Sequence, residues 1–146
     1  MTEKEYKMEL KDKFITYRPN LYLPNDITFG VEIEYANVVK DTISYLLNEE
    51  QKEGNLIDWE NKSEFDIAFY NRYGEEENGE VNSPILNDNI NTWKDLAYLL
   101  KLLKNKGANV TEKCGSHINI GAHILGDNII YWRNFLLLWI LYYHSI

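Results

Sequence analysis

The stretch FGVEIEY, at residues 29–35, places Glu32 and Glu34 between apolar residues. Successive side chains of an extended strand point to opposite faces, so both carboxylates would share one face. Two carboxylates held about 7 Å apart repel each other unless a cation lies between them. The stretch therefore predicts either a cation site mounted on a strand or a half-buried strand whose polar face is solvated.

Later segments repeat this alternation of polar and apolar residues. Asp66 lies in one alternating stretch and Glu80 begins another. His117 and Asn119 would share one face of a third. Carboxylates combined with a few neutral nitrogen or oxygen ligands suit hard cations such as Mg²⁺ or Mn²⁺. Singly, each residue is better explained by a solvated or hydrogen-bonded structural role, and only convergence of the faces would make a site.

Composition limits the classes of partner and compartment. The chain of 146 residues has 15 basic and 23 acidic residues, a formal charge of −8, which argues against duplex nucleic acid as a ligand. Its single cysteine, Cys114, excludes an internal disulfide framework. The charged N-terminus lacks the apolar core of a signal peptide, and the apolar run at 135–143 is shorter than the ~20 residues that span a bilayer. We therefore expect a cytoplasmic protein without membrane association.

Periodicity and turn residues predict an α+β domain. We expect helices at 37–54 and 91–105, the second capped by Asn91 or Thr92, and a third from Asp127 or Asn128 to the chain end. Strands are expected at 29–35, 56–60, 65–70, 80–83, 109–114 and 116–121, with a hairpin turn at Asn78-Gly79. Residues 1–27 are expected to form an N-terminal arm, partly helical or frayed, before one domain at 28–146.

The order of four motifs resembles the putative amidoligase family, carboxylate–amine ligases related to glutamine synthetase and glutamate–cysteine ligase. The motifs are FGVEIE at 29–34, Trp59 with Asp66, GEVNSPIL at 79–86 and CGSHINIG at 114–121. The resemblance runs from Thr28 to the chain end. It implies a mainly antiparallel sheet with helices packed on one face, similar to the N-terminal half of a glutamine synthetase-like catalytic domain. It also implies that the domain is incomplete at its C-terminal end, because the family's chains continue further.

The resemblance implies an enzyme that uses ATP and Mg²⁺ or Mn²⁺ to join a carboxylate and an amine, from small molecules or peptides, through an acyl phosphate. Divalent ions on a carboxylate-lined sheet would offset the phosphate charge. Matched motif by motif, the resemblance implies four metal ligands, namely Glu32, Glu34, Glu80 and His117. It implies that Glu34 and His117 are also catalytic. Asn119 and Asp66 would contact the cofactor or substrate.

Two departures from the family pattern leave other interpretations open. Asn119 stands where the family has a second histidine, and an amide cannot titrate near neutral pH. Ala68 stands in place of a serine. The chain could therefore be a catalytically incomplete remnant that binds metal and acts as a binding or regulatory partner, or a structural domain with a solvated polar face.

The last predicted helix is apolar on nearly every side between Ile129 and Tyr143. Such a helix is normally buried on most sides, whereas one sheet can cover only one of them. A large exposed apolar patch usually marks an interface. We therefore expect this helix to pack against a missing half, a separately encoded second chain or a second copy of this chain. The alternative is that the N-terminal arm covers it.

Overall fold

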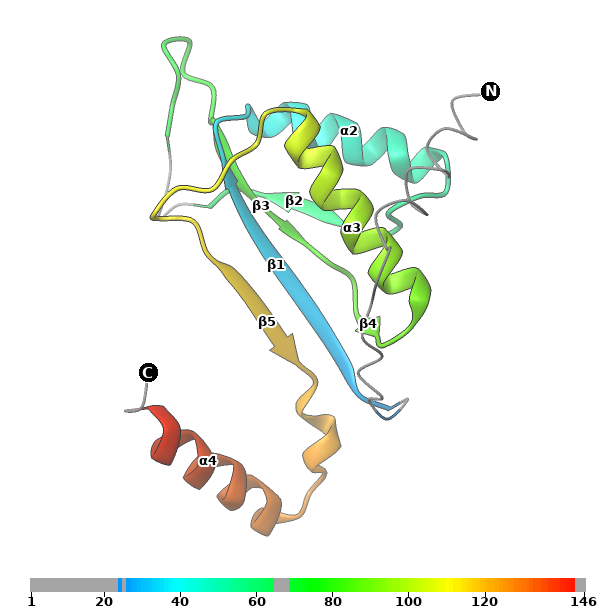
Figure 1. Ribbon diagram of the computed structural model, residues 1–146, viewed down its shortest axis with the longest axis vertical. Helices are drawn as coiled ribbons and strands as arrows, with labels where there is room; N and C mark the ends of the chain where they lie inside the picture. Colours follow the sequence, from blue (N-terminus) through cyan, green and yellow to red (C-terminus); the bar gives the residue numbers. More distant parts are fainter. Residues whose placement is uncertain (1–23, 25, 65–68, 144–146) are drawn as a thin grey trace.

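The computed structural model describes residue 24, residues 26–64 and residues 69–143, which form an α+β fold around an antiparallel sheet (Figure 1). The long strand β1 (Thr28–Ala36) lies within the sheet. On one side it pairs with β3 (Asn78–Asn82) and then β4 (Leu86–Asn87), and on the other with β5 (Ser116–Ile120). The short strand β2 (Glu60–Lys62) pairs with the outer edge of β3. The expected strands at 29–35, 80–83 and 116–121 are thus confirmed.

Two helices, α2 (Lys40–Lys52) and α3 (Ile90–Asn105), cover one face of the sheet (Figure 1). Their apolar stripes meet the apolar face of β1 and β3 in one core, which also includes Trp59 before β2 and Leu86 on β4. The core consists of Tyr35, Val38, Ile43, Leu47, Leu56, Trp59, Val81, Leu86, Tyr98, Leu99 and Leu103. The opposite face of β1, which carries Glu32 and Glu34, is free of these helices.

The helix ends follow local chemistry. Asn89 caps α3, since its side chain accepts hydrogen bonds from the backbone N–H groups of Asn91 and Thr92. The cap is therefore Asn89 and not Asn91 or Thr92, the residues predicted from the sequence. Gly107 follows α3 with φ +89°, a left-handed conformation that glycine adopts without steric cost.

The prediction of a hairpin turn at Asn78-Gly79 is wrong. Both residues lie in β3, where Asn78 pairs with Ala36 and is fully buried. The turn lies instead at 71–74, inside the bridge between Tyr70 and Glu76, and Asn71 Oδ1 accepts hydrogen bonds from two backbone N–H groups there. Gly79 is required on the sheet, because a Cβ there would lie 2.6 Å from the Tyr35 hydroxyl.

Two predicted strands are also wrong, and two predictions lie outside the described residues. At 56–60 only Glu60 is in a strand, since Leu56 and Asp58 have positive φ. At 109–114 only an isolated bridge from Asn109 to Ala36 forms, followed by a turn. Most of the predicted strand at 65–70 and almost all of the N-terminal arm fall outside the described parts of the chain.

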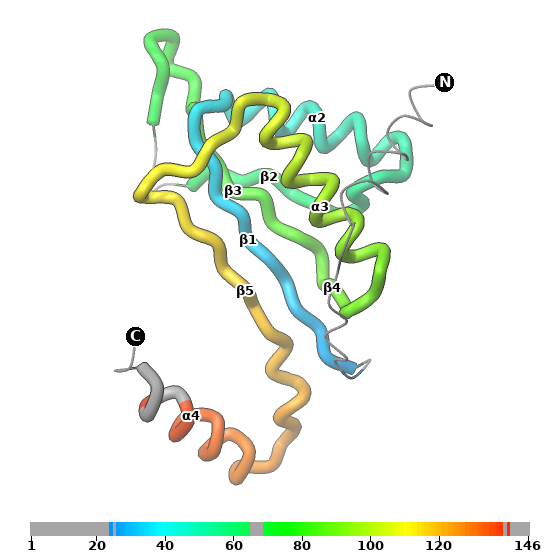
Figure 2. Tube along the Cα trace, viewed as in Figure 1, coloured from blue at the N-terminus to red at the C-terminus, as the bar shows by residue number. Residues whose placement is uncertain are grey.

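The C-terminal helix α4 (Ile129–Tyr143) lies apart from α2 and α3, beyond the end of β5 (Figure 2). Asn128 Oδ1 accepts a hydrogen bond from Ile130 N at its start, as predicted. Most of its described apolar side chains are exposed, from 47% at Phe135 to 76% at Ile129. No helix in the described part of the chain combines the length and the apolar character needed to cross a membrane.

Candidate metal centre

Strand pairing brings the predicted polar residues onto one face of the sheet. On β1, Glu32 lies opposite Asn82 of β3 and opposite His117 of β5, whereas Glu34 lies opposite Glu80. Residues directly opposite each other in neighbouring strands point to the same face. The residues predicted from three separate segments therefore share the face that α2 and α3 leave open.

The ligand atoms on this face form two overlapping triads. One contains Glu32, Glu80 and His117, and within it one potential ligand atom from each residue lies within 4.8 Å of the others. The second contains Glu34, Glu64 and Glu80 at the same spacing. Glu80 belongs to both triads. We call Glu32, Glu34, Glu64, Glu80 and His117 the carboxylate cluster.

Two side chains of β5 contact the carboxylate of Glu32. Its Oε1 accepts a hydrogen bond from Asn119 Nδ2 at 2.7 Å, and its Oε2 lies 2.9 Å from His117 Nδ1. A proton or a cation must lie between His117 Nδ1 and Glu32 Oε2. Without one, a lone pair on the nitrogen would face a lone pair on the carboxylate oxygen, and the two would repel. Asn119 thus orients a carboxylate of the cluster.

Glu34 is the most buried carboxylate of the cluster, with 8% of the residue exposed. Its Oε2 accepts a hydrogen bond from the backbone N–H of Gly115 at 2.7 Å. A Cβ at Gly115 would lie 3.5 Å from Glu34 Oε1, in ordinary van der Waals contact. The backbone before β5 therefore fixes this carboxylate by hydrogen bonding.

Glu80 is partly buried and belongs to both triads of carboxylates. Burial raises the pKa of the Glu80 carboxyl above its ordinary 4.5, a hydrogen bond with Asn82 opposes this, and the charges of Glu32, Glu64 and Glu34 raise the pKa further. Neighbouring negative charges disfavour ionisation of a carboxyl group. A cation within the cluster would remove this cost.

The donor set fits a hard divalent cation. The cluster offers carboxylate oxygens and one imidazole, and Asn82 adds an amide oxygen on the same face. Asn82 Oδ1 is buried without a hydrogen-bond partner among the described residues, although buried polar atoms are normally satisfied. Oxygen-rich sites of this kind suit Mg²⁺ or Mn²⁺. The residues present therefore fit the metal that the family resemblance implies.

A groove borders the cluster at the end of β1 that carries Gly30. It has a volume of about 350 Å³ and is lined by residues of β1, β5 and the segment 83–85, among them Gly30, Ser83, Ile85 and Asn119. This segment bulges between β3 and β4, and Ser83 Oγ accepts a hydrogen bond from Val31 N. Bulges frequently lie beside functional sites. The groove has the size of a small-molecule site.

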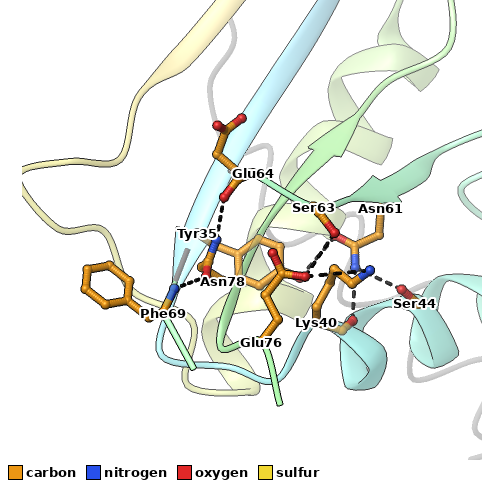
Figure 3. Close-up of polar contacts among 9 residues, drawn as sticks. All are labelled: Tyr35, Lys40, Ser44, Asn61, Ser63, Glu64, Phe69, Glu76 and Asn78. Atoms are coloured by element: carbon orange, nitrogen blue, oxygen red, sulfur yellow. Dashed lines mark hydrogen bonds and ion pairs between the residues drawn. The ribbon is translucent and has the colours of Figure 1, made fainter. Parts of the chain in front are cut away.

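A second polar network lies at the other end of the cluster, around Glu64 (Figure 3). The buried Asn78 donates a hydrogen bond to the backbone carbonyl of Glu64. Ser63 Oγ donates to Glu76 Oε2 at 2.9 Å, and Lys40 Nζ lies 3.8 Å from the same oxygen. Side-chain contacts therefore anchor the backbone that carries Glu64.

The structure brings together four predicted site residues, Glu32, Glu34, Glu80 and His117, and places Asn119 against Glu32. Asp66 lies outside the described residues. Sequence reasoning missed Glu64 and Asn82. Asn82 follows Glu80 by two residues, and Glu64 continues the alternation Glu60, Lys62, Glu64. That period of two was the available signal for both.

Comparisons with protein-family models, with curated proteins and with solved structures find no match to this chain.

Proposed function

We propose that this chain supplies the divalent-cation face of an ATP- and Mg²⁺-dependent carboxylate–amine ligase, or of the N-terminal half of one. The observation that carries the proposal is the convergence of four carboxylates and His117 in two triads that share Glu80. A structural strand with a solvated face has no need to gather like charges at this spacing, which costs energy without a cation. The motif order of the amidoligase resemblance supports the same activity.

The proposed reaction joins an acid and an amine in two steps. The γ-phosphoryl group of ATP passes to a carboxylate oxygen, and ADP leaves. The amine nitrogen then attacks the acyl carbon, phosphate leaves, and a proton is lost from the nitrogen. Bound divalent ions would supply the positive charge that offsets the phosphate and carboxylate oxygens.

The residues of the cluster have distinct tasks in this proposal. Glu80 contributes to both triads, Glu32 is oriented by Asn119, and Glu34 is fixed by the Gly115 backbone. His117 lies at the exposed edge, with 63% of its side chain accessible. In this proposal its imidazole is the general base that accepts the amine's proton. The groove beside Asn119 would hold a substrate.

The test is ATP hydrolysis that requires Mg²⁺ together with a carboxylate and an amine. Glu80→Gln should abolish both this turnover and Mg²⁺ binding measured by calorimetry, because it removes the shared ligand. Glu49→Gln on α2 is the matched control, since Glu49 pairs with Lys52 on the far side of the core and should leave both unchanged. A wild-type protein that binds neither Mg²⁺ nor Mn²⁺ would contradict the proposal.

A second function is a cation-binding partner without turnover of its own. The excess of negative over positive charge on the sheet face of the carboxylate cluster favours this second function. Lys62 is the basic residue that strand pairing places opposite Glu80, but it already forms an ion pair with Glu60 at 3.1 Å. The phosphates of ATP would then need cationic groups from elsewhere. Mg²⁺ binding without ATP hydrolysis, with hydrolysis restored by a co-expressed second chain, would distinguish this function from the first.

A further inference from the structure

Asn78 is a fully buried polar side chain on the same sheet face as the carboxylate cluster. It precedes Glu80 by two residues in β3 and lies opposite Ala36. Its Nδ2 donates to the backbone carbonyl of Glu64 at 3.0 Å, and its Oδ1 accepts from the backbone N–H of Phe69 at 2.7 Å (Figure 3). One amide therefore holds both ends of the segment 64–69.

These bonds begin where regular strand pairing stops. The pairing of β2 with β3 runs from Glu60 opposite Asn82 to Lys62 opposite Glu80. Glu64 lies beyond it, yet its carboxylate comes within 4.8 Å of Glu34 and Glu80. The Asn78 side chain continues the attachment to β3 at this point, with a side-chain donor in place of a backbone one.

The chemistry of this position requires a primary amide. The site offers one carbonyl acceptor and one N–H donor, and an amide of this length satisfies both. An aspartate would accept from Phe69 but place a carboxylate against the Glu64 carbonyl. Alanine would leave the Glu64 carbonyl and the Phe69 N–H without their hydrogen-bond partner. Buried polar groups without a partner lower the stability of the folded protein.

We propose that Asn78 is a positioning residue that fixes Glu64 within the cation-binding cluster. The inference rests on the proposed function, because it assumes that the cluster binds a divalent cation. Asn78 acts through the backbone of Glu64 and does not itself reach the ion. It therefore couples the backbone position of Glu64 to cation affinity.

The first test is a double-mutant cycle on Mn²⁺ affinity, measured by electron paramagnetic resonance. Asn78→Ala should weaken Mn²⁺ binding roughly 10–100-fold, the effect expected when the support of a ligand is lost. In the Glu64→Gln background the same change should have little further effect on affinity, while still lowering the midpoint of thermal unfolding. Equal losses of affinity in both backgrounds would show a general structural role and overturn the inference.

A second measurement does not depend on the folding of Asn78→Ala. Coupling between two sites is reciprocal, so Mg²⁺ binding in the wild-type protein should slow hydrogen exchange at the Phe69 amide, which bonds to Asn78. Glu64→Gln should remove this protection. Mg²⁺ binding without added protection at Phe69 would overturn the inference alone. A wild-type protein that binds no Mn²⁺ would overturn the proposed function, and the inference with it.

Discussion

The helix-covered part of the protein and its C-terminal part differ in how far their apolar side chains are buried. In the first, made of β1 to β4 with α2 and α3, Val81 and Leu99 are fully buried. In the second, made of β5 and α4, Ile118 is 70% exposed and Ile140 60% exposed. The carboxylate cluster spans both parts, since Glu34 and Glu80 lie on β1 and β3 and His117 lies on β5. The candidate site therefore joins a well-buried scaffold to an edge that α2 and α3 do not cover.

The difference shows that an apolar pattern indicates which residues need burial, but not what buries them. Ile118 lies opposite Val31 and so shares the sheet face that the helices cover elsewhere. Its exposure follows from its place on an outer strand, beyond the reach of α3. The same reasoning predicts that matched substitutions have different effects in the two parts.

The largest effect is expected from a charge placed in the covered part. Val81→Asp should prevent folding, with a loss of more than about 4 kcal/mol, because it buries an unpaired charge. Ile118→Asp is the matched change on the same sheet face and should cost about 0.5 kcal/mol or less, since the side chain remains solvated. Urea unfolding followed by circular dichroism measures both. Similar losses in the two variants would show that β5 is buried in solution.

Association through α4 is the next largest effect. Exposed contiguous apolar surface normally marks an interface, so we predict that the protein elutes above monomer mass in size-exclusion chromatography with light scattering. Leu136→Lys combined with Ile140→Lys should return it to a monomer, because the two residues lie one turn apart on α4. Ile57→Lys is the control, since Ile57 is a half-exposed apolar residue of the covered part. A monodisperse wild-type monomer would contradict the prediction.

Sequence periodicity was sufficient for the long elements. Alternation or helical spacing predicted β1, α2, α3 and β5, because these patterns extend over whole elements, whereas α4 was predicted from the capping residues before an apolar run. Local signals failed where distant contacts decided the conformation. Asn78-Gly79 has the composition of a turn, but pairing with β1 and burial of the Asn78 amide outweigh that preference.

The candidate site was predictable to a similar degree. The period of two placed Glu32, Glu34, Glu80 and His117 on polar faces, and the sheet register then brought those faces together. Glu64 was missed although it continues the alternation of Glu60 and Lys62, because its position beyond β2 also depends on the contact with Asn78, which sequence spacing does not reveal. Asn82 was missed although it follows Glu80 by two residues, because spacing does not show that its amide oxygen is buried without a hydrogen-bond partner among the described residues.

Glu34→Gln tests whether the buried carboxylate serves cation binding or folding. The amide oxygen can still accept the Gly115 hydrogen bond, so the free energy of unfolding without cations should change by about 1 kcal/mol or less. Removing one negative charge also eases repulsion within the cluster. Mn²⁺ affinity should fall at least about tenfold. If thermal unfolding shows that this variant does not fold, the functional assignment of the face is wrong.

The smallest effect is the pH dependence of the cation-free protein. The pKa of Glu80 is raised in the folded state, so the folded protein holds this proton more strongly than the unfolded chain does. The free energy of unfolding should therefore fall as pH rises above about 4.5, by less than about 1 kcal/mol because solvent screens the partly exposed group.

Mg²⁺ should abolish that fall in stability, since the cation takes the place of the proton in offsetting Glu32, Glu34 and Glu64. Glu80→Gln should flatten the cation-free profile, whereas Glu49→Gln on the far side of the core should leave it unchanged. Thermal unfolding between pH 4 and pH 7, with and without Mg²⁺, measures these profiles. A stability that rises with pH in the cation-free protein, and rises equally in Glu80→Gln, would place the controlling carboxylate outside the cluster.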